Sequence, residues 1–237
     1  MKAACWGLAH FDADYHRSGP KATPAVVAKG ALVESLDRYL AELASANPTP
    51  GGGSAATIVG ALGAALVAMV ARIDAGNPKY AEYRDAAVRI VEAADRLREE
   101  ISAARDLDEL AFSRVVNAQN LPKATEEEKA VRARLLESAL HGAAEVPLKT
   151  CELCIEVLRL AEQAAHIPNR SLASDVGCAA EFGAAALAAC AYNVRVNHRY
   201  MRDARAIEGQ AETLVRYEHE ASRLLEVVRR DVSAALR

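Results

Sequence analysis

Between Pro78 and Pro122 the chain contains no glycine or proline, and one apolar stripe follows this whole stretch. The stripe predicts a single helix that opens at Asn77–Pro78 and ends near Gln119, roughly 60 Å long at about 1.5 Å per residue. A helix of this length is too long for a compact monomer of 237 residues unless it is bent. The members of the stripe alternate steps of four and three residues, the rhythm of a coiled-coil seam: Tyr83, Ala87, Ile90, Ala94, Leu97, Ile101, Ala104, Asp108, Ala111 and Val115.

The composition fits an all-helical protein. The chain has 237 residues, of which 51% are hydrophobic and only 5% aromatic, and alanine supplies much of the apolar content. Alanine has the highest helix propensity and lets neighbouring helices approach closely. The formal net charge of −3 provides no strong basic field, so we expect no nucleic-acid partner.

Periodicity and capping signals divide the chain into helices. Ser54 and Ser174 are expected N-caps, Thr125 with Glu128 fits a capping box, and Pro147 is expected to kink or split a helix. The expected helices span 32–45, 54–73, 77–119, 126–145, 147–165, 175–200 and 207 to the C-terminus. We predict an all-α, up-and-down helical bundle, with residues 1–30 as a loosely ordered N-terminal extension and residues 31–237 as a single domain. The seam and the alanine-rich faces favour a homodimer.

Two runs, residues 55–71 and 176–194, are apolar enough to raise the question of a membrane span. They are rich in alanine, they lack aromatic belts, and the second contains Glu181, so buried helices of a soluble bundle are the favoured interpretation. The expected helix that contains residues 55–71 is apolar all round, so we expect other helices to enclose it on all sides. Residues 1–30 lack the apolar stretch of a signal peptide, and we expect a cytoplasmic protein with no membrane partner.

Five cysteines, an odd number without disulfide-framework spacing, favour reduced thiols. Cys151 and Cys154 form a C-x-x-C, for which the alternatives are a redox or metal site and ordinary core thiols. The pair lies inside a helical stretch without a second ligand pair, which favours core thiols. The six histidines show no HxxxH or HExxH spacing, so no metal site is expected.

Asp108 interrupts the long stripe where the pattern asks for an apolar side chain. A carboxylate in a seam loses solvation, so its pKa is expected to rise. A carboxyl group that is protonated near neutrality can act as a general acid. The alternative is a polar residue that only fixes the register of the helices.

Two other places are candidates for binding a ligand. On the helix 175–200, Asp175, Asn193 and Asn197 share one face, and the two asparagines offer donors and acceptors to a flat heteroaromatic ring. The alternative there is hydrogen bonding between helices. In NPTPGGGS, residues 47–54, glycines allow a ligand to approach the backbone, and the free N–H groups of the next helix attract anions or carbonyl oxygens. The alternative there is a simple hinge.

Several motifs resemble those of the formiminotransferase-cyclodeaminase family, which comprises cyclodeaminase domains and stand-alone methenyltetrahydrofolate cyclohydrolases. The resemblance covers about residues 32–200, and the motifs stand in the family's order. They are PTPGGGSAATIVGALGAALVAMVAR at 48–72, D-x-x-A-F at 108–112, LPKATEEEK at 121–129, VPL at 146–148, SDVG at 174–177 and NVRVN at 193–197.

The resemblance implies an all-helical homodimer that acts on folate one-carbon units, with a tetrahydrofolate derivative as substrate and no other cofactor. One family reaction hydrolyses 5,10-methenyltetrahydrofolate to 10-formyltetrahydrofolate, and the other closes 5-formiminotetrahydrofolate to the methenyl form with release of ammonia. Both pass through a tetrahedral carbon between two folate nitrogens, and both require a proton at a nitrogen. By resemblance Asp108 donates that proton. The substrate-binding residues implied are Gly51, Gly52, Gly53, Ser54, Lys79, Ser174, Asp175, Asn193 and Asn197.

The chain departs from the family after the alanine-rich helix, where the family carries a basic L-T-x-G-K-K-K-Y. Here the stretch reads IDAGNPKY, so Asp74 replaces a threonine and Lys79 alone remains of the basic run. A folate's glutamate tail is anionic, so fewer lysines weaken its attraction. Because no formiminotransferase sequence precedes it, the chain is expected to be the cyclohydrolase. The alternatives are a formiminotetrahydrofolate cyclodeaminase and a helical dimer that binds a ligand or partner without catalysis.

Overall fold

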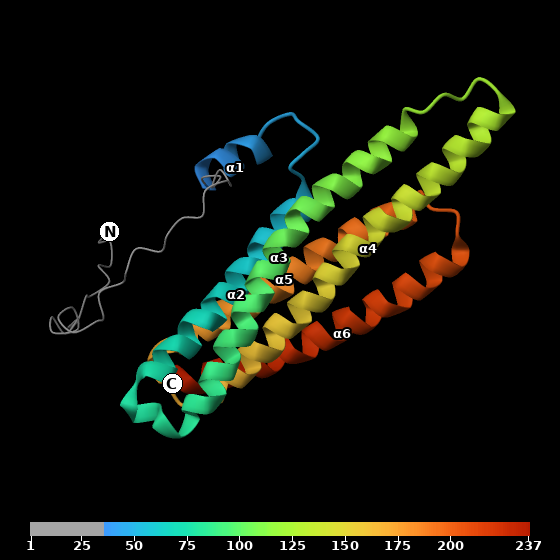
Figure 1. Cartoon of the computed structure of the whole chain (residues 1–237). Helices are drawn as coiled ribbons and strands as arrows, with labels where there is room; N and C mark the ends of the chain where they lie inside the picture. The colour runs from blue at the N-terminus through green and yellow to red at the C-terminus, as the bar shows by residue number, and fades with distance from the viewer. Residues whose placement is uncertain (1–35) are drawn as a thin grey trace, which may run out of the picture. The chain divides into compact units, whose positions relative to one another are not determined.

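The structure is a computed structural model that describes residues 36–237 (Figure 1). These residues form one compact unit of helices and contain no strand, which confirms the predicted all-α class. The predicted extension, residues 1–30, lies outside the described residues. The helices are α1 (Leu36–Leu43), α2 (Gly52–Gly76), α3 (Arg84–Gln119), α4 (Glu126–Ala165), α5 (Ala173–His198) and α6 (Ala204–Ala235), with 3-10 turns at Pro78–Tyr83 and Arg170–Leu172.

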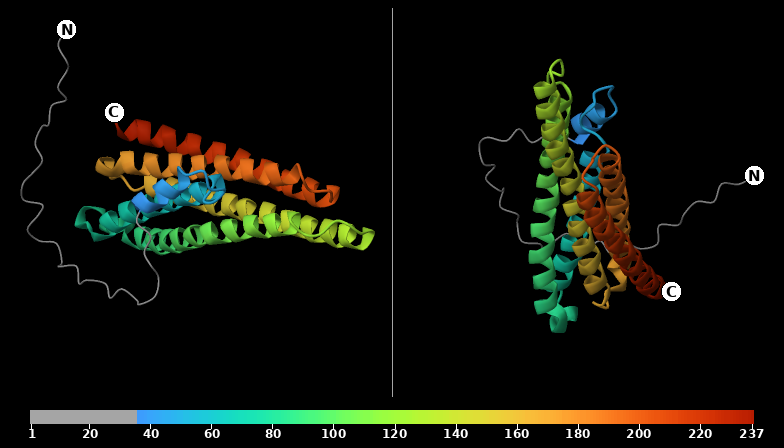
Figure 2. Two further views of the ribbon diagram at one scale, coloured as in Figure 1. Left: turned by 90° about the horizontal axis from the view of Figure 1, so that it is seen from above. Right: turned by 90° about the vertical axis from the view of Figure 1, so that its right-hand side faces the viewer.

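Helices α2 to α6 run up and down beside one another (Figures 1 and 2). Helix α2 packs against α3 and α5, while α4 packs against α3, α5 and α6. The hairpin formed by α3 and α4 extends beyond the ends of the other helices. The N-terminus of α2 and the C-terminus of α5 therefore meet beside the middle of α3 and α4, and this is where the candidate site lies.

The apolar stripe of the long helix faces the core as predicted. Its alanine, isoleucine, leucine and valine members between Ala87 and Val115 are buried, and Asp108 is partly buried among them. The predicted helix is not continuous from Asn77, because residues 78–83 form a 3-10 turn in which Tyr80 leaves helical geometry. Helix α3 itself has 36 residues, a length of about 54 Å.

The ends of several elements differ from the sequence prediction. The capping box at Thr125 and Glu128 is confirmed. The predicted N-caps Ser54 and Ser174 are wrong, because α2 begins earlier with Gly51 as its N-cap and α5 begins after Leu172. In both cases preceding residues adopt helical geometry, so the serine lies inside the first turn. The hydroxyl of Ser54 bonds to side chains of α1 and α3 instead.

The predicted split at Pro147 is also wrong. Helix α4 continues through Pro147 for its full 40 residues. Proline lacks the N–H that would bond to the carbonyl of residue 143, and in this helix that carbonyl accepts a hydrogen bond from Asn197 of α5 instead. The carbonyl of Ala143 therefore keeps a hydrogen-bond partner, and the helix continues at the position where a proline would otherwise interrupt it.

The C-x-x-C pair lies in the bundle core. Cys151 and Cys154 are free, buried thiols. A hydrogen bond with Cys190, together with burial, raises the pKa of Cys151, and burial raises the pKa of Cys154. Protonated, buried thiols are poor nucleophiles, so the geometry agrees with the core-thiol interpretation.

Two helical segments, Gly52–Gly76 and Arg170–His198, are long and apolar enough to span a membrane by length and composition alone. Of their most apolar windows, 56% and 39% are buried within the bundle. The expectation that α2 is enclosed on all sides is wrong for a single chain, because Leu62, Met69 and Ile73 are exposed along one side of it.

Candidate active site

The glycine-rich stretch forms one wall of a cavity. Gly51 caps α2 in an extended conformation, and the first intrahelical bond joins the N–H of Ala55 to the carbonyl of Gly51. The N–H groups of Gly52, Gly53 and Ser54 therefore have no partner within α2. Such a helix N-terminus presents hydrogen-bond donors and the positive end of a dipole to whatever lies in front of it.

Asp108 of α3 lies directly against this N-terminus. A Cβ built on Gly53 would stand 2.4 Å from Oδ2 and 2.5 Å from Oδ1 of Asp108. Only glycine allows this approach, because real Cβ contacts are essentially never that short. The sequence analysis selected Asp108 and the glycines separately, and the fold brings them into contact.

Burial raises the pKa of Asp108, as the stripe predicted. The negative charge of Glu109 raises this pKa further, while a hydrogen bond from the backbone of Ser54 lowers it. A carboxyl group balanced in this way can hold a proton at higher pH than an exposed aspartate, while the α2 N-terminus keeps it oriented.

Glu109 and Ser54 belong to a hydrogen-bonded chain behind the cavity wall. The hydroxyl of Ser54, which is fully buried, donates to Oε1 of Glu109 at 3.1 Å and lies 3.0 Å from the hydroxyl of Tyr39 in α1. The Arg105 guanidinium lies over the Tyr39 ring at 5.9 Å. This chain ties α1, α2 and α3 together, so Ser54 supports the wall rather than lining the cavity.

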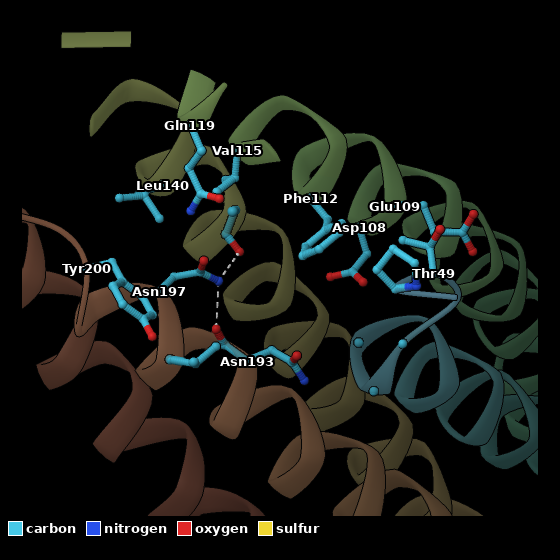
Figure 3. Close-up of a pocket in the computed structure, with 16 residues that line it drawn as sticks. Thr49, Asp108, Glu109, Phe112, Val115, Gln119, Leu140, Asn193, Asn197 and Tyr200 are labelled. Atoms are coloured by element: carbon cyan, nitrogen blue, oxygen red, sulfur yellow. Dashed lines mark hydrogen bonds between the residues drawn. The ribbon is translucent and has the colours of Figure 1, made fainter. Parts of the chain in front are cut away.

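Two asparagines from the last turns of α5 form the opposite wall (Figure 3). The side-chain nitrogen of Asn197 donates to the carbonyl of Ala143 at 3.0 Å and to the carbonyl of Asn193 at 2.8 Å. Both of its N–H donors are thereby used, which leaves the side-chain oxygen as an acceptor. The nitrogen of Asn193 donates to the carbonyl of Ala189, so Asn193 retains a second N–H and its oxygen.

These walls enclose a cavity of about 330 Å³ (Figure 3). This volume lies within the usual range of small-molecule sites, about 300–1,000 Å³. Asp108 and Glu109 are its two titratable carboxyl groups, and it has no lysine or arginine among its lining residues. The lining residues are Pro48, Thr49, Gly51, Gly52, Gly53, Asp108, Glu109, Phe112, Val115, Gln119, Leu140, Ala143, Asn193, Val196, Asn197 and Tyr200.

Several lining residues escaped the sequence analysis. Val115 appeared only as a member of the apolar stripe and Phe112 only within the D-x-x-A-F motif. Phe112, Val115 and Gln119 follow Asp108 at helical steps of four, three and four, so the period of the helix held a signal for them. Glu109 lies beside the stripe, and the periodicity of the stripe gave no reason to select Glu109. Tyr200 follows NVRVN by three residues, just beyond the end of α5.

Three predicted binding residues lie elsewhere. Asp175 and Ser174 occupy the first turn of α5, about 27 Å along the helix axis from Asn193 at 1.5 Å per residue. Lys79 lies beyond Gly76, the C-terminal residue of α2, which by the same measure is about 36 Å along the helix axis from Gly52. The ammonium of Lys79 lies over the ring of Tyr80. None of the three lines this cavity, so their role in substrate binding stays a prediction.

A profile of the family described as Formiminotransferase-cyclodeaminase matches residues 35–216. The chain belongs to the formiminotransferase-cyclodeaminase family. The matched span contains the whole cavity, including Asp108, the glycine wall and both asparagines.

Known members of the formiminotransferase-cyclodeaminase family resemble this chain in sequence. A methenyltetrahydrofolate cyclohydrolase of Methylorubrum extorquens is 42% identical over 170 residues, which cover 72% of this chain and 82% of that protein. The formimidoyltransferase-cyclodeaminase of Mus musculus is 32% identical over 172 residues, which cover 73% of this chain and 32% of the mouse protein. The chain thus matches about a third of the length of the mammalian relative.

The fold is shared with a solved structure of the family. The crystal structure of formiminotetrahydrofolate cyclodeaminase from Thermotoga maritima matches 86% of this chain and 98% of its own chain, with a TM-score of 0.78 and 28% identity. Among residues 36–237 no group of three histidine, cysteine or acidic side chains is placed to hold a metal ion.

Proposed function

We propose that this protein is a methenyltetrahydrofolate cyclohydrolase that hydrolyses 5,10-methenyltetrahydrofolate to 10-formyltetrahydrofolate, with Asp108 as its proton donor. The observation that carries the proposal is the contact between the Asp108 carboxyl group and Gly53 at the N-terminus of α2, inside a cavity of suitable size. The 42% identity to a relative of that name supports the choice of reaction.

The charge of the cavity fits this substrate. The methenyl carbon is part of a cationic amidine. The negative charge of Glu109, with no lysine or arginine among the lining residues that the structure describes, favours a cation. Asn193, Asn197 and Gln119 supply amide donors and acceptors for the edge of a pterin, while Phe112 and Tyr200 supply flat apolar contacts.

The reaction then requires three proton movements. Water adds to the methenyl carbon and loses one proton, which gives a neutral tetrahedral carbon between the two nitrogens. As the bond to N5 breaks, the hydroxyl oxygen becomes the formyl carbonyl and loses its proton, while N5 gains one. The net product is 10-formyltetrahydrofolate and one released proton. In this proposal Asp108 delivers the proton to N5, and the N–H groups of Gly52 and Gly53 would stabilise the developing oxygen charge.

The test follows the loss of the near-ultraviolet absorbance of the methenyl substrate. Removing a general acid typically costs about 10²–10⁴-fold, so Asp108→Asn should lower kcat by at least about two orders of magnitude. Asp106→Asn is the matched control, because Asp106 is two residues away and its side chain is 77% exposed. Turnover by Asp108→Asn at the rate of the unaltered protein would refute the assignment.

The cyclodeaminase reaction is the second candidate, supported by the Thermotoga maritima structure. It also presents a cationic amidine carbon. Asp108 would then protonate the amino group on the tetrahedral carbon, so that the C–N bond breaks and ammonia leaves. Ammonia release from 5-formiminotetrahydrofolate distinguishes this reaction from the hydrolysis. Saturable folate binding without either turnover would indicate a binding protein that lacks catalysis.

We further propose a homodimer formed through α2 and α5. These adjacent helices expose the large apolar side chains Leu62, Met69, Phe182 and Tyr192, which a second copy would cover. Leu62→Glu should then convert the dimer to a monomer in light scattering. Leu107→Glu, at a leucine of similar exposure (54% against 51%) on α3, should leave the dimer intact. A monomeric unaltered protein would contradict the proposal.

The exposed free thiol of Cys178 is compatible with a cytoplasmic location, the compartment we infer.

A further inference from the structure

A second, smaller cavity lies at the opposite end of the bundle from the active site and has a volume of about 50 Å³. Asp74, in the last turn of α2, lines it together with the last turns of α4 and α6 and the first turn of α5. This is the aspartate that stands in place of the family's threonine. The proposed folate reaction makes no use of it.

The Asp74 carboxyl group is almost completely enclosed, with 1% of the residue exposed. Its Oδ1 accepts a hydrogen bond of 2.6 Å from the side-chain nitrogen of Asn169. Its Oδ2 is buried and has no hydrogen-bond partner among residues 36–237. A buried carboxylate oxygen without a partner is costly, and burial accordingly raises the pKa of Asp74. The atom therefore requires a proton of its own, a hydrogen-bond donor or a cation.

The surroundings of Asp74 disfavour a bare negative charge. Three helices, α2, α4 and α6, end around this cavity, and helix C-termini carry partial negative charge and carbonyl oxygens without intrahelical partners. The N-terminus of α5 is the one opposing helix end. Arg170 is the one cationic side chain that lines the cavity, and its Nε already donates to the carbonyl of Ala235 at 2.7 Å.

We propose that this cavity binds a small monovalent cation, such as potassium or ammonium, with Oδ2 of Asp74 as its charged ligand. The volume exceeds the roughly 10–15 Å³ that one water molecule needs by the same measure. Asp231 also lines the cavity, but its Oδ1 accepts a hydrogen bond from Nε of Arg230 at 3.1 Å. Asp74 is therefore the lining carboxylate whose charge a single cation would balance. Magnesium and calcium favour several carboxylate or water ligands, and the described residues hold no cluster of three acidic, histidine or cysteine side chains.

The cation would stabilise the folded state, because the unfolded chain has no such cavity. A ligand at ten times its dissociation constant would raise the melting temperature by about 3–6 °C for a protein of this size. Thermal unfolding of the full chain is therefore measured in potassium, ammonium, sodium or choline chloride at equal ionic strength, since choline is too large for the cavity. We expect potassium or ammonium to raise the melting temperature above its value in choline.

Two variants locate the effect. Asp74→Asn keeps the shape of the side chain and removes its charge, so its melting temperature should be the same in potassium or ammonium as in choline. Asp85→Asn is the matched control, because Asp85 is exposed at the start of α3, at the same end of the bundle, and this variant should keep the cation response. Equal melting temperatures of the unaltered protein in all four salts, or a response that persists in Asp74→Asn, would overturn the proposal.

A second measurement does not depend on the variants folding. Rubidium replaces potassium in crystals of the unaltered protein, and its anomalous scattering marks its position. A peak within bonding distance of Oδ2 of Asp74 supports the site. An ordered water at Oδ2 without anomalous signal would show that the cavity holds solvent and would refute the proposal.

Discussion

Pro147 offers a test of how the active site is built, because it leaves a carbonyl oxygen free in the middle of α4. The residue four positions earlier is Ala143, whose carbonyl accepts the hydrogen bond from Asn197 at 3.0 Å. Replacing Pro147 by alanine restores an N–H that competes for this carbonyl. Asn197 then loses one of the two bonds that fix its orientation. We therefore expect Pro147→Ala to weaken catalysis while it strengthens the helix.

The sizes of both effects follow from the contacts. Proline costs about 3 kcal/mol in a helix interior relative to alanine. Pro147 is buried, and its ring removes about two methylenes from water, worth roughly 1.6 kcal/mol. The lost bond from Asn197 offsets a further ~0.5–1.5 kcal/mol, and the free energy of unfolding should therefore rise by less than about 1 kcal/mol. One hydrogen bond is worth about 0.5–1.5 kcal/mol, which corresponds to a decrease in kcat/KM of about 2- to 13-fold.

The assay combines the methenyl absorbance with denaturant unfolding. Gly142→Ala is the matched control, because Gly142 is exposed in the same helix with nothing within 4 Å of a built Cβ. It should stabilise α4 by about 1 kcal/mol through helix propensity and leave kcat/KM unchanged. In an Asn197→Ala background, Pro147→Ala should have no further effect on kcat/KM. An unchanged kcat/KM for Pro147→Ala in the unaltered background would refute the link between the proline and the asparagine.

Two further substitutions probe the Asp108 wall. Gly53→Ala should lower the free energy of unfolding by about 1–3 kcal/mol, because its Cβ would stand 2.4 Å from a carboxyl oxygen of Asp108. Gly52→Ala should leave the free energy of unfolding unchanged, because its Cβ would be 4.0 Å from the nearest side chain. Equal melting curves for the two variants would contradict the packing argument. Glu109→Gln removes a charge that raises the pKa of Asp108, so this pKa should fall. Because the donor must be protonated, the loss of kcat/KM with rising pH should then begin at lower pH; a pH profile that stays in place or moves upward would show that Glu109 does not act on Asp108.

The sequence by itself determined the helical class and the course of α3 from Arg84 to its end at Gln119. The stripe from Tyr83 to Val115 has the period of a helix. Periodicity depends only on the order of the residues, so it predicts a helix whatever the packing of the bundle. The same stripe identified Asp108, because a charge at a core position is visible without coordinates. Local chemistry likewise fixed the capping box at Thr125, which involves residues three apart.

Only the tertiary structure decided which of the candidate residues meet. Asp175, Asn193 and Asn197 share a face of α5, but a helix separates residues eighteen positions apart by about 27 Å, so the asparagines reach the cavity and the aspartate does not. Pro147 does not break its helix because a side chain from α5 satisfies the carbonyl that proline leaves free. The contact between Gly53 and Asp108 joins residues of different helices. Distances between helices arise from packing, which no local pattern along one segment encodes.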